Sequence, residues 1–169
     1  NWIISELGLL YAGAVSVPLS IKLEEANDLL FRLRHADVKV LFVSKNQLPK
    51  VAKIVDQLPD LEHIIVWGDV ESDLAIAETL EALKAAGEQY LKEHEEEFLA
   101  IGRALKNDDY ATITYTSGTT ADPKGVVLTH RNYTANVEQA LSVVSIPSSW
   151  RTLIILPLDH CFAHVAGFY

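Results

Sequence analysis

Residues 115–130, YTSGTTADPKGVVLTH, place a polar run between two segments rich in β-branched residues. Six of the ten residues from 116 to 125 are Gly, Ser or Thr. YATITYT before this run (residues 110–116) and GVVLTH after it (residues 125–130) both have strand character. The stretch therefore predicts two antiparallel strands joined as a β-hairpin with a long polar tip.

The polar tip has the donors that a polyphosphate needs, although two known phosphate-binding patterns do not fit it. A Walker A loop ends in Gly-Lys-Ser/Thr and opens a helix, whereas Lys124 precedes Gly125 and a strand follows. The G-x-G-x-x-G dinucleotide pattern is also absent. Short hydroxyls, glycines that admit close backbone approach and one mobile lysine still suit phosphate oxygens. The same residue types dominate ordinary surface turns, so composition alone leaves both interpretations open.

Helical and strand patterns alternate along the chain outward from the hairpin. The expected helices cover residues 1–14, 24–36, 45–58, 72–105 and 131–144, and the expected strands cover 15–19, 38–44, 62–68, 110–116, 125–130 and 151–158. This alternation predicts an α/β fold with a mostly parallel sheet flanked by helices. We expect Gly87 to break the acidic helical segment, the glutamates at 93–97 to form a solvated face, and Asn132 to cap a helix.

Composition excludes several classes of protein. The 169 residues include 14 Lys and Arg against 23 Asp and Glu, a net charge of −9 that argues against a nucleic-acid partner. Cys161 is the only cysteine, and no run of about 20 apolar residues could span a membrane. No signal peptide is recognisable. We expect a cytoplasmic protein, and because both ends fall in apolar segments, we expect a piece of a longer one.

YTSGTTADPKGV (residues 115–126) resembles the phosphate-binding signature of the adenylate-forming (AMP-binding) superfamily, which includes acyl-CoA synthetases, luciferases and peptide-synthetase adenylation domains. ELGLLYAGAVSVPL (6–19) resembles the early helix-strand segment of that family. LPLDHCFAH (156–164) resembles a later motif in which a histidine follows Leu-Pro after two residues. The resemblance implies that residues 1–169 are part of the large N-terminal domain, without its C-terminal remainder and the lid domain. Ala121 departs from the family pattern, which has glycine there.

The resemblance implies a two-step reaction. A carboxylate attacks the α-phosphate of ATP with Mg²⁺ to give an acyl-adenylate and pyrophosphate, and coenzyme A then takes the acyl group. His160 matches a family position near the acyl and thioester chemistry, which implies a positioning role. The residues implied to hold the β- and γ-phosphates are Thr116, Ser117, Gly118, Thr119, Thr120 and Lys124.

The substrate suggested by this resemblance is a long-chain fatty acid. LEALKAAGEQYL (80–91) and LPLDHCFAH resemble the long-chain fatty acid–CoA ligases more than other branches. Short-chain, aromatic and amino acids remain alternative substrates, and a catalytically silent nucleotide-binding module is an alternative function. The chain alone is predicted to be inactive and, through exposed apolar surface, to self-associate.

The residues around His160 permit other interpretations that we consider weaker. His160 and His164 have a spacing that can bind zinc on a helix, but no HExxH glutamate accompanies them, so we expect no metal site. Ser117, Asp159 and His160 are the residue types of a hydrolase triad, but no G-x-S-x-G elbow is present. Cys161 is expected to be a packed apolar residue.

Overall fold

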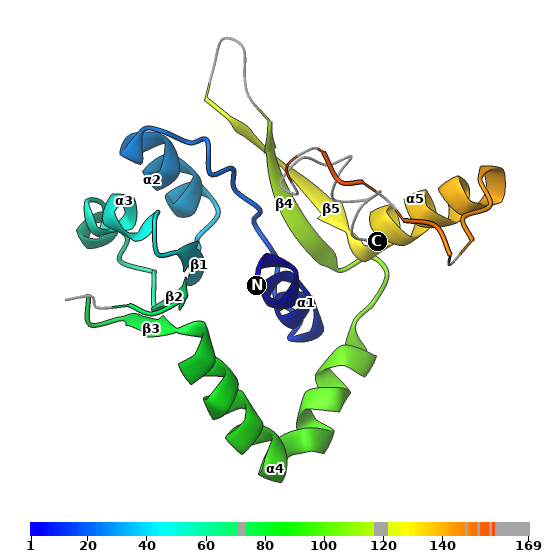
Figure 1. Cartoon of the computed structure of the whole chain (residues 1–169), viewed down its shortest axis with the longest axis horizontal. Coiled ribbons are helices and arrows are strands. Elements are labelled where there is room, and N and C mark those ends of the chain that lie inside the picture. The colour runs from blue at the N-terminus through cyan, green and yellow to red at the C-terminus, as the bar shows by residue number, and fades with distance from the viewer. Residues whose placement is uncertain (71–73, 117–121, 148, 152, 156, 158–169) are drawn as a thin grey trace. The chain divides into compact units, whose positions relative to one another are not determined.

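The computed structural model describes residues 1–70, 74–116, 122–147, 149–151, 153–155 and 157. These residues form two compact units, shown with their helices and strands in Figure 1. The first unit comprises Asn1–Ser5 and Ile21–Arg103, and the second comprises Glu6–Ser20 and Ala104–Tyr169. Helices alternate with strands along the chain, which confirms the predicted α/β class.

A parallel sheet forms the centre of the first unit. It consists of β1 (Val40–Ser44), β2 (His63–Trp67) and β3 (Ala77–Thr79), with β2 in the middle. Ile64 and Ile65 of β2 are 0% and 1% exposed. Such continuous burial is typical of a parallel strand that is covered on both faces. The two strands that the sequence predicts in this part of the chain are confirmed.

The third strand of this sheet was not predicted, and the helical segment expected from residue 72 begins later. β3 pairs with β2 through Ile64↔Ala77 and Val66↔Thr79, and the amide of Ile64 also donates to the carbonyl of Ile76 at 2.8 Å. A strand of three residues is too short for an alternating pattern to distinguish it from a helix.

Short helical segments supply the apolar cover of the parallel sheet. α2 (Ala26–His35) precedes β1, and α3 (Leu48–Ala52) with the 3₁₀ turn Val55–Gln57 connects β1 to β2. This connection is the crossover that parallel strands require. Pro49 lies in the first turn of α3, where its missing N–H removes no helical hydrogen bond. The buried apolar residues of these segments and their connections are Leu33, Leu48, Val51, Ile54, Leu58 and Leu61.

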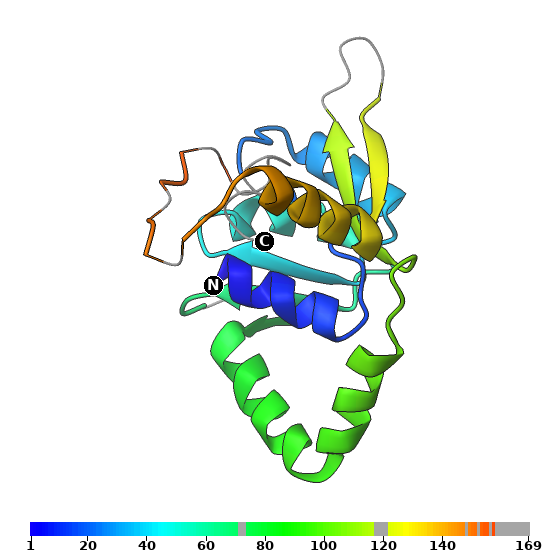
Figure 2. The ribbon, with the colours of Figure 1, turned by 90° about the vertical axis from the view of Figure 1, so that its right-hand side faces the viewer.

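The long helix α4 (Leu80–Ala104) is kinked, and Figures 1 and 2 show its two arms. The kink lies at His94, whose φ of −128° and ψ of 20° are not helical. The predicted break at Gly87 is wrong, because the helix continues through that residue. The imidazole of His94 stacks on Tyr90 with ring centroids 4.2 Å apart, and its Nδ1 lies 3.0 Å from the carbonyl oxygen of Tyr90.

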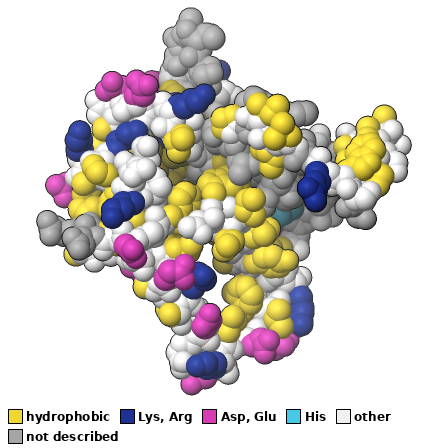
Figure 3. All heavy atoms as spheres, in the orientation of Figure 1, with side chains coloured by type: hydrophobic (Ala, Val, Ile, Leu, Met, Phe, Trp, Pro, Cys, Tyr) yellow, Lys and Arg dark blue, Asp and Glu magenta, His cyan; other side chains and the backbone are white. Residues whose placement is uncertain are grey.

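The acidic run of α4 is exposed, as predicted. Glu93, Glu95, Glu96 and Glu97 are all exposed, and Figure 3 shows acidic and basic side chains interspersed on this helix. Partial desolvation, a hydrogen bond with Glu97 and the charge of that carboxylate raise the pKa of Tyr90.

An antiparallel hairpin forms the centre of the second unit. It consists of β4 (Tyr110–Thr116) and β5 (Lys124–Thr129), and α5 (His130–Val143) follows β5 without a loop. Figures 1 and 2 show α5 leaving the base of the hairpin, at the opposite end from its tip. The predicted pair of strands around the polar loop is confirmed. α1 (Trp2–Tyr11) crosses the boundary between the units and contributes its second half to this one.

Two predicted strands of the second unit are wrong. In residues 15–19 only Ser16 pairs, in an isolated parallel bridge with Thr112, because Pro18 has no N–H with which to extend a ladder. In residues 151–158 the described positions do not lie in a strand. Leu153 and Ile155 are exposed there, and apolar β-branched character does not make a strand without a packing surface.

Candidate functional site

Thr116 and Lys124 are the predicted site residues that lie within the described part of the chain. Thr116 is the last residue of β4 and Lys124 is the first residue of β5. The other predicted site residues lie outside the described residues: Ser117, Gly118, Thr119, Thr120 and His160. The same holds for the further residues discussed from the sequence: Ala121, Asp159, Cys161 and His164.

The hairpin register brings Thr116 and Lys124 together. The two residues are direct partners across the antiparallel pair, next to the pair Tyr115↔Gly125. Directly opposite residues project from the same face of a sheet, with Cβ atoms about 4.5–5.5 Å apart. Both residues are exposed. A hydroxyl donor and a primary ammonium group are therefore available on one face at the tip end of the hairpin.

A small buried core anchors the base of the hairpin. Ala111 of β4 packs with Leu10 of α1 and Tyr133 of α5. The Thr112 hydroxyl lies 2.8 Å from the Tyr133 hydroxyl, and Thr112 is fully buried. The burial of β4 falls from this base toward Thr116, which is exposed.

The ends of the two strands are also joined by polar contacts. The Arg131 guanidinium donates two hydrogen bonds to the Asp108 carboxylate, at 2.8 and 3.2 Å, and the Arg131 amide donates to the carbonyl of Asn107 at 2.7 Å. Thr129 is the N-cap of α5, and Asn132 completes a reciprocal capping box. The predicted cap is therefore corrected: Thr129 is the N-cap, and Asn132 is the third residue of the helix, N3.

A buried carboxylate in α1 was missed by the sequence analysis. Glu6 and Ser16 are both buried, and the Ser16 hydroxyl donates to Glu6 Oε2 at 2.5 Å. Ser16 also bonds β4 through its backbone, with its amide donating to Ala111 and its carbonyl accepting from Ile113. The signal in the sequence is an acid within an apolar helical run. The contact of Glu6 with Ser16, which bonds β4, indicates that this carboxylate connects α1 to β4.

The arrangement at the hairpin tip suits an anion. The lysine ammonium group offers three donors and a full positive charge, and the threonine hydroxyl adds a neutral donor. Among the residues that the structure describes, no group of three or more His, Cys, Asp or Glu side chains could hold a metal ion.

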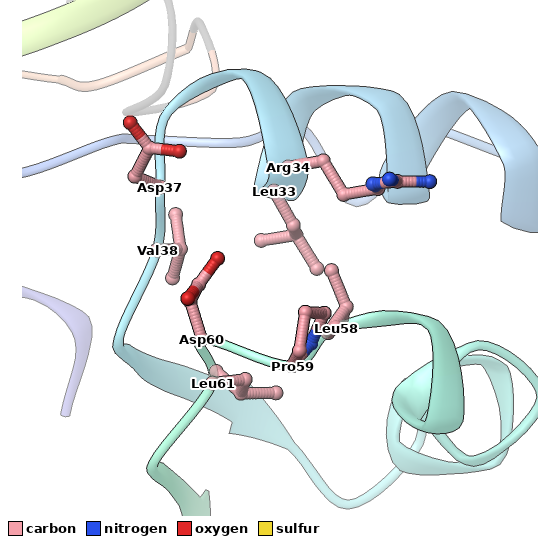
Figure 4. A pocket seen from close by; sticks show the side chains of 8 residues that line it. All are labelled: Leu33, Arg34, Asp37, Val38, Leu58, Pro59, Asp60 and Leu61. Carbon is pink, nitrogen blue, oxygen red and sulfur yellow. The ribbon is translucent and has the colours of Figure 1, made fainter.

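A separate pocket of about 180 Å³ lies within the first unit (Figure 4). Leu33, Leu58 and Leu61 form its apolar wall, and Asp37 and Asp60 contribute carboxylates. The pocket contains no predicted site residue. Its lining residues include two carboxylates and one guanidinium, that of Arg34, and this net negative charge disfavours a polyphosphate.

No helix within the described ranges is long and apolar enough to cross a membrane.

Comparison with known proteins identifies a family over the whole length of the chain. The model of the AMP-binding enzyme family matches residues 1–169. The peroxisomal long chain acyl-CoA synthetase 6 of Arabidopsis thaliana is 32% identical over 169 residues, an alignment that covers 96% of this chain and 23% of that protein. The chain spans about a quarter of the length of the curated relatives that it matches.

Solved structures match the fold. A red-emitting luciferase from Phrixothrix hirtus superposes with a TM-score of 0.71 at 21% identity, covering 96% of this chain and 31% of the luciferase. The anthranilate CoA ligase AuaEII, solved in complex with anthranoyl-AMP, superposes with a TM-score of 0.60 at 25% identity, covering 81% of this chain and 24% of the ligase.

Proposed function

Since this chain belongs to the AMP-binding enzyme family, we propose that it is part of an ATP-dependent acyl-CoA ligase. The single observation that carries the proposal is the pairing of Thr116 with Lys124 at the exposed end of the hairpin. The name of the Arabidopsis relative, a long chain acyl-CoA synthetase, supports the same reaction. The full-length protein would activate a carboxylic acid as its adenylate and transfer the acyl group to coenzyme A.

The proposed roles of the two residues follow from the charge that develops during adenylation. When the substrate carboxylate attacks the α-phosphate, the bond to the β-phosphate breaks and pyrophosphate leaves with added negative charge. Lys124 and Thr116 would donate to the β- and γ-phosphate oxygens. Prearranged donors stabilise such a transition state because they need no reorganisation as the charge forms. Mg²⁺ bound with ATP would neutralise part of the same charge.

The remaining residues of the phosphate-binding signature belong to the same proposal. They would surround the pyrophosphate from the loop between β4 and β5: Ser117, Gly118, Thr119 and Thr120. His160 would position the acyl group or the thiol. A full-length His160→Ala enzyme is expected to form the adenylate at a near-normal rate and the thioester slowly. Normal thioester formation would contradict the role of His160.

The proposed substrate is a long-chain fatty acid. The Arabidopsis relative is named for long-chain acyl groups, whereas the anthranilate CoA ligase is named for an aromatic acid. The first of these has the higher identity, 32% against 25%, and it agrees with the resemblance of residues 80–91 and 156–164 to the long-chain branch. Cytoplasmic location remains our proposal from the composition, although the Arabidopsis relative is named as peroxisomal.

The decisive experiment is ATP–pyrophosphate exchange by the full-length protein, with acetate, palmitate, a hydroxycinnamate and amino acids offered separately. Exchange that depends on palmitate would support adenylation and the long-chain branch, and added coenzyme A would then test the second step. Exchange with the hydroxycinnamate alone would keep the ligase and change its substrate class. Absence of exchange with every acid, by folded protein that binds Mg-ATP, would favour a silent nucleotide-binding module.

Residues 1–169 are proposed to be part of the large N-terminal domain of this enzyme. The isolated chain is then expected to show no exchange and to self-associate through apolar side chains such as Val143 and Leu153, which are 84% and 81% exposed. Light scattering of the purified chain tests self-association. A monodisperse monomer would contradict it, and turnover by the isolated chain would contradict its inactivity.

A further inference from the structure

Gly125 faces a crowded space. A Cβ atom built on this glycine would lie 2.9 Å from Cγ2 of Ile113 and 3.6 Å from Cε1 and Cζ of Tyr115. The first distance is shorter than real Cβ contacts allow. Ile113 and Tyr115 are two residues apart on β4, so both project from the face on which their partner Gly125 lies. Their side chains therefore occupy the volume where a side chain at position 125 would project.

Space, and not backbone conformation, explains this glycine. Among the residues that the structure describes, the glycines with positive φ are Gly13 and Gly68, so the backbone of Gly125 is one that alanine can adopt. The crowding atom of Ile113 is a branched γ-methyl, which sits next to the backbone and has little rotamer freedom. The sequence alone assigned Gly125 to close approach of the backbone to phosphate, whereas its neighbours in the hairpin are hydrophobic side chains.

The crowded face is the opposite one from Thr116 and Lys124. Adjacent residues of a strand project to opposite faces, so Lys124 points away from the side on which Gly125 meets Ile113. A methyl group at position 125 needs a shift of at least about 0.5 Å to reach ordinary carbon–carbon contact. Such a shift moves the backbone of β4 relative to that of β5, one residue from the pair that carries the hydroxyl and the ammonium group.

We propose that Gly125 is a positioning residue for the phosphate donors of the hairpin. Its missing side chain lets Ile113 and Tyr115 close over β5, and this packing holds Thr116 and Lys124 at the spacing that the phosphates require. The inference rests on the proposed function. Gly125 itself does not touch the nucleotide in this account; it acts through the separation and register of the two strands.

The test is steady-state kinetics of the full-length Gly125→Ala enzyme in ATP–pyrophosphate exchange. A misplacement of about 1 Å in a catalytic arrangement can cost about 100-fold, so for a smaller shift we expect kcat/KM for ATP to fall by roughly 10- to 100-fold. The KM for the carboxylic acid is expected to stay within about twofold, because a displaced phosphate donor does not act on the acyl site. Gly87→Ala is the matched control, since a Cβ there meets no atom within 4 Å.

A second pair of variants separates positioning from a general effect on folding. In Gly125→Ala/Ile113→Leu the branched γ-methyl is removed, and kcat/KM for ATP is expected to return to within about threefold of wild type. In Gly125→Ala/Ile113→Val both γ-carbons remain, and no recovery is expected. Equal recovery in the two double variants, or unchanged constants in Gly125→Ala, would overturn the proposal. If Gly125→Ala does not fold, the two double variants are compared directly and the same ranking is required.

Titration calorimetry with Mg-ATP on the same variants distinguishes this inference from the proposed function. A wild-type protein that shows no exchange but binds Mg-ATP would overturn the ligase proposal. The role of Gly125 would then be tested by the affinities of the variants for Mg-ATP. Gly125→Ala/Ile113→Leu is expected to bind more tightly than Gly125→Ala/Ile113→Val. A wild-type protein that neither exchanges nor binds Mg-ATP would overturn both.

Discussion

The strands of the parallel sheet and those of the antiparallel hairpin differ in how far they are buried. Ile64, Ile65 and Val66 of β2 are buried in succession, whereas β4 is buried only near its base and ends at the exposed Thr116. Burial of β2 removes apolar surface from water and stabilises the first unit. The tip of the hairpin lacks that stabilisation, and in the proposed function its polar side chains bind the phosphates of ATP. Substitutions in the two regions should therefore change different quantities.

The largest expected effect is on stability, at the centre of the parallel sheet. Ile65→Ala removes side-chain atoms from a site that is 1% exposed, and deletions of this kind destabilise proteins by about 2–5 kcal/mol. Hydrogen exchange of peptides covering β2 in the full-length protein measures the loss locally. Val40→Ala, at an exposed position of β1, is the control and should change exchange much less. Equal effects of the two substitutions would show that β2 is not the stabilising centre.

The next largest effect is on catalysis, at the tip of the hairpin. Lys124→Ala removes a charged donor, and hydrogen bonds to charged groups contribute about 1.5–3 kcal/mol, which corresponds to roughly 10- to 150-fold in kcat/KM for ATP. Hydrogen exchange of β2 should not change. Lys92→Ala is the control, because this lysine is exposed on α4 and bonds Gln89 in its own helix. If Lys124→Ala changed the hydrogen exchange of β2 without changing the kinetics with ATP, the expected difference between the two regions would be wrong.

The base of the hairpin should resemble the parallel sheet, because it is buried. Tyr133→Phe leaves the buried Thr112 hydroxyl without the partner that lies at 2.8 Å, which costs about 1–3 kcal/mol. Replacing both partners, in Tyr133→Phe/Thr112→Val, should restore part of that loss, because no buried hydroxyl is then left unpaired. Thermal unfolding measures the stability of the single and the double variant. Tyr110→Phe, at an exposed position of β4, serves as the control and should be neutral.

The hairpin and the central strand were predictable because their signals are local. Residues 115–130 combine β-branched segments with turn residues, and β2 is a short apolar run, so each pattern can be recognised within one window. β3 has only three residues, and no residue type marks the kink at His94. Gly87, which does carry a helix-breaking signal, lies within the 25-residue helix α4 because one glycine costs only about 1 kcal/mol and good helix formers surround it.

The site was predictable in its residue types and not in its register. The signature names Thr116 and Lys124 as phosphate-binding candidates, but a slip of one residue between the strands would place them on opposite faces. The pairing Thr116↔Lys124 depends on how β4 and β5 meet, including an irregularity between Tyr110 and Thr112. The role proposed for Gly125 depends on the same register, because only the pairing shows which side chains lie above it.

The smallest expected effect is at the ion pair between the two ends of the hairpin segment. Asp108 and Arg131 have side chains that are 78% and 60% exposed, and exposed pairs contribute about 0.2–1 kcal/mol even with two hydrogen bonds. Arg131→Ala should therefore lower the thermal unfolding temperature slightly, and the difference should shrink in high salt because the pair is screened. The backbone contact from Arg131 to Asn107 remains in this variant and keeps the strand ends together.

Arg103→Ala, which removes a similarly exposed pair with Glu96, is the matched control in the first unit. If Arg131→Ala lowers kcat/KM for ATP and Arg103→Ala does not, then the base of the hairpin, as well as the packing around Gly125, controls the geometry of its tip.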